Sequence, residues 1–305
     1  MQIGIIDIGS NSIKLLIVEP SQSGQFEQVL FEVEEKRIGE GMTLNPPRIL
    51  NADIRKAAMA IGRLRQIARQ YDLADLKIVA TSAVRDASNQ VEFSKAILDK
   101  TGIDIEVLSG DNEAHFIGKG ALQDSELSDL NNFVLIDLGG GSMECIQFED
   151  RIQKTHRSFN LGAVRLASTF IQDRKIPLLQ ESETAIEKHV VKTLSHSPIG
   201  PNAAIRTAVL TGGASSTLDG ILCRRNNATS ATISDLQSLC QEICSANLEE
   251  RIVHLGIPIE RADIIPAAAI IIRTALEHLK CDAAHFTRFN LRAGLIAEML
   301  EKESN

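Results

Sequence analysis

One pattern occurs twice in this chain and limits the folds that the chain can adopt. Residues 3–8 and 133–138 are short, mainly apolar runs typical of buried strands. Each run ends in an aspartate and an apolar residue, and a glycine follows it. A turn containing serine follows each run, and another apolar segment follows each turn. Because the two copies lie roughly a domain apart, we interpret them as an internal duplication of one strand–turn–strand unit. The sequence therefore predicts an α/β protein with two related domains.

The segments around the two copies fit this duplication, because strand-like runs and helical periodicity alternate in both halves. We expect strands at 3–8, 13–18, 26–33, 77–81, 103–108, 133–138, 143–148, 152–159 and 208–210, a hairpin turn at 21–24, and helices at 52–71, 91–101, 113–122 and 264–279. No low-complexity linker separates the halves, so the repeat sets the boundary. Residues 1–124 are expected to form the first domain and residues 125–305 the second, with a last helix that could pack back on the first.

The composition argues against a nucleic-acid-binding protein. Aromatic residues make up only 4% of the chain, so few side chains could stack on bases, and the formal net charge is −8. Neither value suits binding through stacking or through a broad basic surface. A phosphate-handling enzyme is still allowed, because local loops and a metal ion can hold phosphate without a basic surface.

The sequence also indicates where in the cell the protein is expected to be. Its N-terminus has no basic stretch and no cleavage-like segment, and its longest apolar run, 264–272, is too short to span a membrane and contains Pro266. The five cysteines are scattered without zinc-like spacing, and we interpret them as reduced thiols. We therefore expect a soluble, cytoplasmic protein with no membrane partner.

Two glycine-containing turns are the first candidates for a phosphate site. Glycine allows a sharp reversal, after which backbone N–H groups and hydroxyls can converge on an anion. The expected phosphate-binding residues are Gly9, Ser10, Asn11, Ser12 and Lys14 in the first copy and Gly139, Gly140, Gly141 and Ser142 in the second. Either turn alone is more often an ordinary hairpin. The repeated pair, with Asp7 and Asp137 at matched positions, favours a site that also holds a hard cation.

A third glycine-rich turn, residues 211–216, follows the apolar strand at 208–210. It fits the capped N-terminus of a helix, and it also fits a third wall of the phosphate site. On the second interpretation Gly212, Gly213 and Ser215 would contact phosphate.

Together these segments resemble the Ppx/GppA phosphatase family of exopolyphosphatases and guanosine pentaphosphate phosphohydrolases. The similarity rests on residues 7–15, 80–85, 109–114, 137–142 and 144, and continues through 161–166, 211–213, 261–263 and 291–294. It implies the fold of the actin–hexokinase–chaperone superfamily, with two duplicated ribonuclease-H-like (actin-like ATPase) domains and a cleft between them. The length is similar to that of short members with two domains. One departure is Ala293, where the family often has glutamate, and we expect no effect on the chemistry.

The resemblance assigns catalytic roles to two charged residues. Glu113 falls on the family's catalytic glutamate and would activate water, whereas its position alone suits a carboxylate that stabilises a helix N-terminus. Asp111 is expected to cap that helix. Arg85 would clamp phosphate oxygens, and the sequence alone equally allows an ion pair with Asp86.

The resemblance also implies a cofactor, Mg²⁺ or another divalent cation. Asp137 and Glu144 would bind it, with Asp7 nearby or bound through water. For Glu144 the alternative is the solvated face of a strand. Arg165 is expected either to steer a polyanion or to be an exposed charge.

The expected reaction is release of terminal orthophosphate from inorganic polyphosphate by a water molecule that Glu113 activates. Guanosine pentaphosphate is the alternative substrate, because the shared motifs do not separate the two activities. Two other classes are a kinase of the same superfamily and a sensor that binds guanosine nucleotides without turnover. The intact Glu113, Asp137 and Glu144 argue against the sensor. The oligomeric state is left open, with a homodimer as one possibility.

Overall fold

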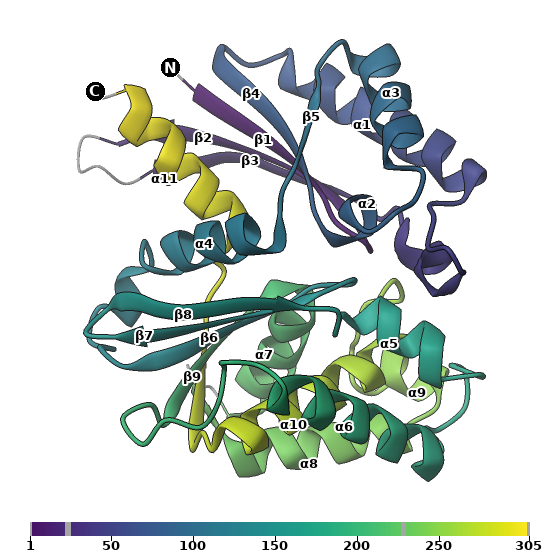
Figure 1. The fold of residues 1–305 in the computed structure, drawn as a ribbon, viewed down its shortest axis with the longest axis vertical. Coiled ribbons are helices and arrows are strands. Elements are labelled where there is room, and N and C mark those ends of the chain that lie inside the picture. Colours follow the sequence, from purple (N-terminus) through teal and green to yellow (C-terminus); the bar gives the residue numbers. More distant parts are fainter. Residues whose placement is uncertain (1, 22–25, 227–229, 304–305) are drawn as a thin grey trace. The chain divides into compact units, whose positions relative to one another are not determined.

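The computed structural model describes residues 2–21, 26–226 and 230–303, and the chain divides into two compact units (Figure 1). Unit 1 comprises Met1–Gln123 and Leu291–Asn305, and unit 2 comprises Asp124–Asn290. The division after Gln123 lies next to the boundary expected from the repeat. The second domain was expected to span 125–305, with a last helix that could pack back on the first domain, and this helix belongs to unit 1. The turn expected at 21–24 falls mainly on residues 22–25, outside the described residues.

The sheet of unit 1 has the strand order β3-β2-β1-β4-β5. The strands are β1 (Gln2–Ile8), β2 (Ile13–Pro20), β3 (Phe26–Glu34), β4 (Leu73–Ala80) and β5 (Ile105–Val107). The first three form an antiparallel meander, and β4 and β5 run parallel to β1. β1 is mainly apolar because both of its faces are buried. Ile6 and Ile8 belong to the hydrophobic core on one face of the sheet, and Ile3 and Ile5 project from the opposite face.

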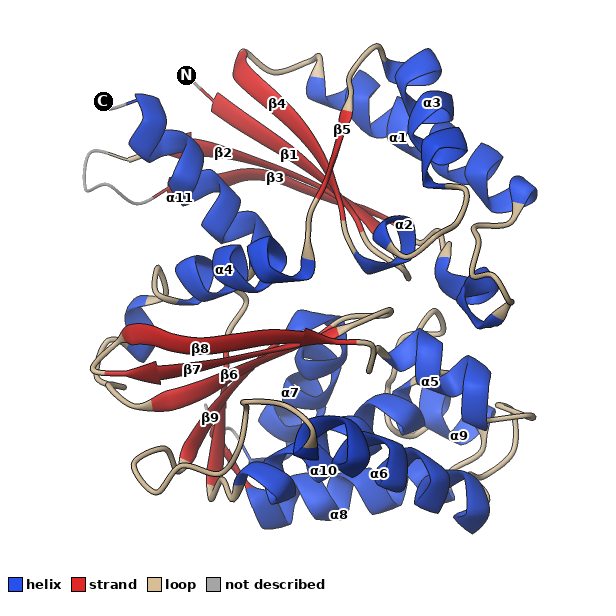
Figure 2. Ribbon diagram, viewed as in Figure 1, coloured by secondary structure: helices blue, strands red, loops and turns tan. Residues whose placement is uncertain are grey.

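Helices cover this sheet on both sides (Figure 2). They are α1 (Asn51–Ala68), α2 (Ser82–Arg85), α3 (Gln90–Thr101), α4 (Gly110–Ala121) and α11 (Leu291–Glu303), with a 3-10 helix, η1 (Gly39–Thr43). Ile61 of α1 and Phe93 of α3 pack into the core on one side, whereas α11 packs on α4 and β1. Gly294 makes this close packing of α11 possible, because a Cβ there would overlap the carbonyl oxygen of Phe116 in α4.

Unit 2 repeats the same topology. Its strands are β6 (Phe133–Leu138), β7 (Met143–Glu149), β8 (Ile152–Phe159), β9 (Thr207–Thr211), β10 (Ser230–Thr232) and β11 (Ala283–Phe286). The strand order is β10-β11-β9-β6-β7-β8, so β8-β7-β6-β9-β11 corresponds to β3-β2-β1-β4-β5, and β10 is an added antiparallel edge strand. This shared order confirms the duplication that the repeated pattern predicted.

The helices of unit 2 build a single large core with one face of its sheet. They are α5 (Ala163–Phe170), α6 (Gln180–Ser195), α7 (Gly212–Asn226), α8 (Ile233–Ser245), α9 (Leu248–Val253) and α10 (Ile265–Leu279), with a 3-10 helix, η2 (Ser125–Leu127). α10 is the apolar helix expected at 264–279, and it contacts α5, α6, α7 and α8 with most of its side chains buried. It is therefore a core helix. Among the described residues, no helix has both the length and the apolar character needed to cross a membrane.

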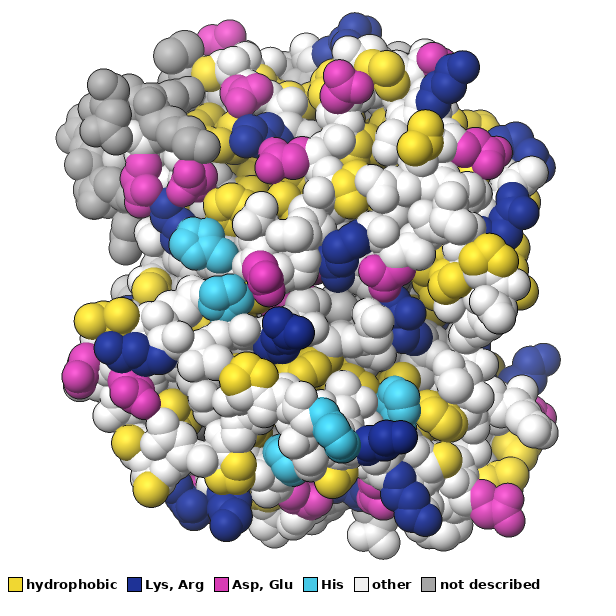
Figure 3. Space-filling view, in the orientation of Figure 1, with side chains coloured by type: hydrophobic (Ala, Val, Ile, Leu, Met, Phe, Trp, Pro, Cys, Tyr) yellow, Lys and Arg dark blue, Asp and Glu magenta, His cyan; other side chains and the backbone are white. Residues whose placement is uncertain are grey.

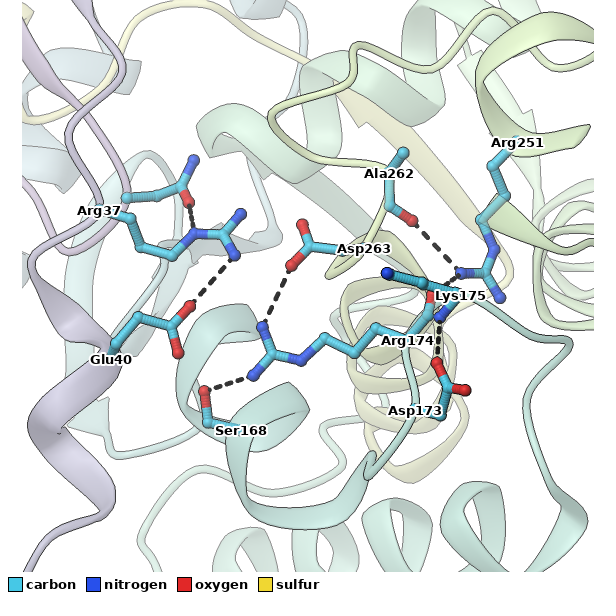
Figure 4. A network of polar contacts seen from close by, with 10 residues as sticks. Arg37, Glu40, Ser168, Asp173, Arg174, Lys175, Arg251, Ala262 and Asp263 are labelled. Atoms are coloured by element: carbon cyan, nitrogen blue, oxygen red, sulfur yellow. Dashed lines mark hydrogen bonds and ion pairs between the residues drawn. The ribbon is translucent and has the colours of Figure 1, made fainter. Parts of the chain in front are cut away.

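A buried arginine ties the loops of unit 2 together (Figure 4). Arg251 in α9 is 1% exposed, and its guanidinium donates to the carbonyl oxygens of Ile243 (3.1 Å), Arg174 (3.0 Å) and Ile176 (3.2 Å). A longer bond, 3.4 Å, reaches the carbonyl oxygen of Ala262. Burial lowers the pKa of this guanidinium, and the carbonyl dipoles compensate the buried charge.

Arg174 extends this network to the helices beside it. Its guanidinium pairs with Asp263 at 3.1 Å and donates to the Ser168 hydroxyl at 2.8 Å (Figure 4). Ser168 lies in α5 and Asp263 lies just before α10. The loop that carries Arg174 is therefore fixed through both its side chain and its backbone.

The face of the molecule in Figure 3 mixes basic and acidic side chains rather than gathering one sign. Exposed ion pairs such as Arg206–Asp282 (2.6 Å) and Arg225–Glu242 (2.7 Å) show the same mixing. This face therefore carries no large patch of a single charge sign.

Replacing Arg251 with methionine should lower the free energy of unfolding by more than about 3 kcal/mol, because several buried carbonyls lose a charged donor and each such bond contributes about 1.5–3 kcal/mol. Urea unfolding followed by circular dichroism measures this loss. Arg206→Met is the matched control, since it removes an exposed arginine and should move the midpoint little. Equal losses in the two variants would contradict the role given to Arg251.

Candidate functional site

The first expected phosphate loop joins β1 to β2 in unit 1. The Gly9 N–H donates to the Ser12 carbonyl oxygen at 3.1 Å, and a Cβ at Gly9 would lie 3.1 Å from the same oxygen. Ser10, Asn11 and Ser12 are all buried. The Asn11 side-chain oxygen accepts a bond from Nε of Arg37 at 2.8 Å. The loop is therefore preformed, and the Asn11 side chain helps to hold it.

Asp7, at the end of β1, lies in a buried ion pair. Its Oδ2 is 2.7 Å from Nη1 of Arg292 in α11, and the two side chains are 9% and 11% exposed. Lys14 on β2 is paired with Asp7 in register, so it adds a second positive charge on the same face of the sheet. The Arg292 guanidinium also lies 5.4 Å from the centre of the Phe31 ring. Asp7 is thus surrounded by basic groups of unit 1 itself.

Unit 1 also brings together the two residues expected to act in catalysis. Nη1 of Arg85, at the end of α2, lies 2.6 Å from Oε2 of Glu113 and donates to the Leu108 carbonyl oxygen at 3.1 Å. Asp86, the partner that the sequence alone allowed, is 3.6 Å from Nε of Arg85. Glu113 is 6% exposed, although it lies in the first turn of α4. A carboxylate that only stabilised the helix N-terminus would not need this burial.

The cap of α4 differs from the sequence expectation. Ser109 is the N-cap, and its hydroxyl oxygen accepts a bond from the Asn112 N–H at 3.1 Å. Asp111 lies exposed within the first turn, so its expected role as the cap was wrong. The physical reason is that Ser109 has the extended backbone that an N-cap requires, whereas Asp111 is already helical.

The second expected phosphate loop, in unit 2, joins β6 to β7 with the same geometry. The Gly139 N–H donates to the Ser142 carbonyl oxygen at 3.0 Å, matching the first loop. The start of α5 holds this loop, since the backbone N–H groups of Val164 (2.8 Å) and Arg165 (3.1 Å) donate to the Gly140 carbonyl oxygen. These contacts fix the backbone between β6 and β7.

Arg165 has a role that the sequence did not predict. Its Nε donates to the Gly141 carbonyl oxygen at 2.8 Å, and the side chain is partly buried. The expectation of a merely exposed charge was therefore wrong, because the guanidinium is hydrogen-bonded to the loop and partly buried. Gly162 allows this docking, since a Cβ there would overlap the backbone of Gly140 and Gly141.

Four polar residues, Ser158, Glu144, Asp137 and Thr211, lie in register on the neighbouring strands β8, β7, β6 and β9, and we call them the polar row. Residues in register project from the same face of a sheet. Within the row, the Ser158 hydroxyl donates to Oε1 of Glu144 at 2.6 Å. Glu144 is 1% exposed and Asp137 is 8% exposed, so Glu144 does not lie on a solvated face.

The third glycine-rich turn lies beside the polar row. Gly212 begins α7 with φ of +93°, and a Cβ there would overlap Oδ1 of Asp137. A Cβ on Gly213 would overlap the guanidinium of Arg261. Ser215 lies in the first turn of α7 and is 1% exposed. The turn is thus both a helix N-terminus and a close neighbour of an acidic side chain and a guanidinium.

The cysteines do not compete for a metal ion at this site. Cys145 follows Glu144 on β7 and is fully buried, and burial, with a smaller contribution from Glu144, raises the pKa of its thiol far above neutrality. The thiolate is the form that binds a metal ion, so this raised pKa disfavours Cys145 as a ligand. Among the described residues, no group of three or more His, Cys, Asp and Glu side chains is placed to hold a metal ion. A cation beside Asp137 and Glu144 would therefore have two carboxylate ligands from this face.

Four residues of these arrangements were given no role from the sequence: Arg292, Ser158, Thr211 and Arg261. Arg292 and Arg261 do belong to the segments that carry the family resemblance, and this was a usable signal. Thr211 also belongs to such a segment, 211–213, whereas Ser158 has no signal of its own, because its position follows from the register of the sheet.

The comparisons with known proteins agree on one family. A sequence model of the Ppx/GppA phosphatase family matches residues 17–303. Exopolyphosphatase 1 of Mycobacterium tuberculosis is 26% identical, with 100% of this chain and 90% of that protein covered. A bifunctional 3-dehydroquinate synthase/phosphatase of Fusobacterium nucleatum is 28% identical and covers 98% of this chain, which spans 46% of that longer protein. A guanosine-5'-triphosphate,3'-diphosphate pyrophosphatase of Vibrio parahaemolyticus is 28% identical, covering 97% of this chain and 59% of that protein.

Solved structures show the same fold. The chain superposes on an exopolyphosphatase from Cytophaga hutchinsonii with a TM-score of 0.86 at 22% identity, covering 99% of this chain and 98% of the other. The Aquifex aeolicus Ppx/GppA family member gives a TM-score of 0.81 at 22% identity, with coverage of 100% and 99%. The expected fold class, two duplicated actin-like domains, is confirmed.

Replacing Arg292 with methionine should lower the free energy of unfolding by about 3–5 kcal/mol, because Asp7 would stay buried without its guanidinium partner. Urea unfolding in the presence of EDTA measures this loss without any contribution from metal binding. The double variant Asp7→Asn with Arg292→Met should recover most of the loss, because no charge then lacks its partner. A double variant as unstable as the single one would contradict the conclusion that Arg292 compensates the buried charge of Asp7.

Proposed function

Because the chain belongs to the Ppx/GppA phosphatase family, we propose that it hydrolyses the terminal phosphoanhydride bond of inorganic polyphosphate and releases orthophosphate. Members of this family are hydrolases of phosphoanhydride bonds. What we propose is the identity of the substrate and of the residues that catalyse the reaction. The observation that carries it is the Arg85–Glu113 pair, in which a buried carboxylate lies 2.6 Å from a guanidinium.

Glu113 is the proposed general base. A neighbouring guanidinium favours the ionised form of a carboxylate, and only this form can accept a proton from water. The 2.6 Å contact with Arg85 also fixes the orientation of the carboxylate. A guanidinium has five N–H donors, enough to hold Glu113 and to donate to a phosphoryl oxygen as well. Arg85 would thus align the base with the phosphorus atom that water attacks.

We propose that Asp137 and Glu144 hold Mg²⁺ or another divalent cation. The residues fit a hard cation, because two carboxylates lie in register on neighbouring strands and a buried hydroxyl, that of Thr211, has no partner among the described residues. When bound, the cation would offset negative charge on the phosphoryl oxygens. Asp7 is not proposed as a direct ligand, because Arg292 already occupies its Oδ2.

The proposed phosphate contacts are the backbone N–H groups and hydroxyls of the two matched loops, residues 9–12 and 139–142. Both loops are tight turns that their surroundings hold in place, so little conformational entropy would be lost on binding an anion. Gly212, Gly213 and Ser215 at the start of α7, with the Arg261 guanidinium beside Gly213, would add donors. Lys14 would act mainly through its charge.

The low aromatic content favours polyphosphate over guanosine pentaphosphate as the proposed substrate. A guanine base would need an aromatic or planar platform, and aromatic residues make up 4% of the chain. The relative from Mycobacterium tuberculosis is named for polyphosphate and the one from Vibrio parahaemolyticus for a guanosine nucleotide, so the relatives support either substrate.

Replacing Glu113 with glutamine should reduce phosphate release from polyphosphate by at least about 100-fold, because the amide keeps the shape but cannot take up a proton. The measurement is orthophosphate release in the presence of Mg²⁺, with guanosine pentaphosphate assayed in parallel. Asp111→Asn is the matched control: it removes an exposed carboxylate from the same helical turn and should leave the rate within about twofold of wild type.

Three outcomes decide between the proposals. Loss of release from polyphosphate in Glu113→Gln alone supports the reaction and the base. Release only from guanosine pentaphosphate keeps the base and replaces the substrate. A Glu113→Gln variant as active as Asp111→Asn would show that another residue activates water.

A further inference from the structure

Thr211, the last residue of β9, has a buried hydroxyl that the fold leaves unsatisfied. The residue is 0% exposed, and its Oγ1 has no hydrogen-bond partner among the described residues. An unsatisfied buried hydroxyl costs about 1–3 kcal/mol, so native proteins almost always pair such groups with protein or with water. The position of Thr211 therefore points to a partner that the polypeptide does not supply.

The missing partner lies on the side of the acidic pair. Thr211 is in register with Asp137 on the neighbouring parallel strand, and their side chains project from the same face of the sheet. Directly after Thr211, Gly212 leaves the space that a side chain would take from Oδ1 of Asp137. The unsatisfied hydroxyl and the carboxylate are thus in-register neighbours, and Gly212 lets the Asp137 carboxylate lie directly beside the start of α7.

A second unsatisfied hydroxyl lies four positions further along the chain. Oγ of Ser215, in the first turn of α7, is also buried without a partner among the described residues. By contrast, the Ser158 hydroxyl at the other end of the polar row is satisfied, because it donates to Glu144. The unsatisfied hydroxyl of the row is therefore the one at the end next to Asp137.

The chemistry of a hard divalent cation accounts for this arrangement. Mg²⁺ binds through one or two carboxylates and keeps several of its water molecules, each of which needs hydrogen-bond acceptors. A buried water molecule is retained only where polar protein groups surround it. The unsatisfied hydroxyl oxygen of Thr211, in register with Asp137, would supply such an acceptor.

We propose that Thr211 is a positioning residue of the cation site: its hydroxyl oxygen accepts a hydrogen bond from a water molecule in the hydration shell of the cation that Asp137 and Glu144 hold. This inference rests on the proposed function for the cation itself. The hydroxyl thereby selects a hydrated ion and fixes its place relative to Asp137.

Replacing Thr211 with valine should weaken the binding of Mg²⁺ by about tenfold or more. This is the usual effect of removing a group that hydrogen-bonds to the ligands of a metal ion without binding the ion itself. Isothermal titration calorimetry with Mg²⁺ alone, on the full chain without any phosphate compound, measures this affinity. In EDTA the variant should unfold at the same urea concentration as wild type or a higher one, because valine removes an unsatisfied hydroxyl.

Thr274→Val is the matched control. Thr274 on α10 also carries a buried hydroxyl with no partner among the described residues, but it is not part of the polar row. Its replacement should leave the Mg²⁺ affinity within about twofold of wild type. Thr211→Ser, which keeps the hydroxyl and loses only a methyl group, should also bind Mg²⁺ like wild type.

The inference is overturned if Thr211→Val binds Mg²⁺ as tightly as wild type, or if Thr211→Ser or Thr274→Val binds it as weakly as Thr211→Val. If wild type itself binds no Mg²⁺, the proposed cation site and this inference fall together. Wild-type binding that is indifferent to Thr211 would overturn the inference alone and leave the proposed cation site standing.

Discussion

Each of the two units buries a carboxylate where its first strand ends, and a buried negative charge requires a positive charge or several donors beside it. In unit 1 the chain supplies the positive charge, because Lys14 is in register with Asp7 and Arg292 lies 2.7 Å from it. In unit 2 the position equivalent to Lys14 is held by Glu144, so Asp137 has a second carboxylate beside it. The duplicated framework has therefore diverged at this position: a carboxylate faces a basic residue in unit 1 and a second carboxylate in unit 2, where we propose that a cation binds.

The position of the C-terminal helix follows from the same requirement. Arg292 lies in the first turn of α11, and Gly294 lets that helix pack directly on α4. α4 in turn carries Glu113, which pairs with Arg85. The helix that completes unit 1 thus supplies the partner of Asp7 and supports the helix of the proposed base.

Much of this arrangement could be predicted from the sequence because it depends on patterns among residues that are close together in the chain. The repeated strand–turn–strand pattern predicted the duplicated topology, and the apolar periodicity of residues 264–279 predicted α10. The helices α5, α6, α8 and α9 and the strands β10 and β11 were not predicted, although α8 and α9 each begin with a capping box. For α7, only its N-terminus was predicted, as one of two interpretations of the third glycine-rich turn.

The pairing of charges could not be predicted in the same way. Asp7 and Arg292 are separated by 285 positions in the sequence, and only the docking of α11 brings them together. The contact of Arg165 with the Gly141 carbonyl and the register of Thr211 with Asp137 likewise depend on tertiary packing. By contrast, Arg85 and Glu113 were found through the family resemblance, which carries tertiary information that the local pattern lacks.

The most direct test of the divergence between the two halves is a crystal structure with Mn²⁺ in place of Mg²⁺, in which anomalous scattering locates the ion. The account predicts one strong anomalous peak beside Asp137 and Glu144, and no peak in contact with Asp7. A peak in direct contact with Asp7, or none beside Asp137 and Glu144 at a saturating concentration of Mn²⁺, would contradict it.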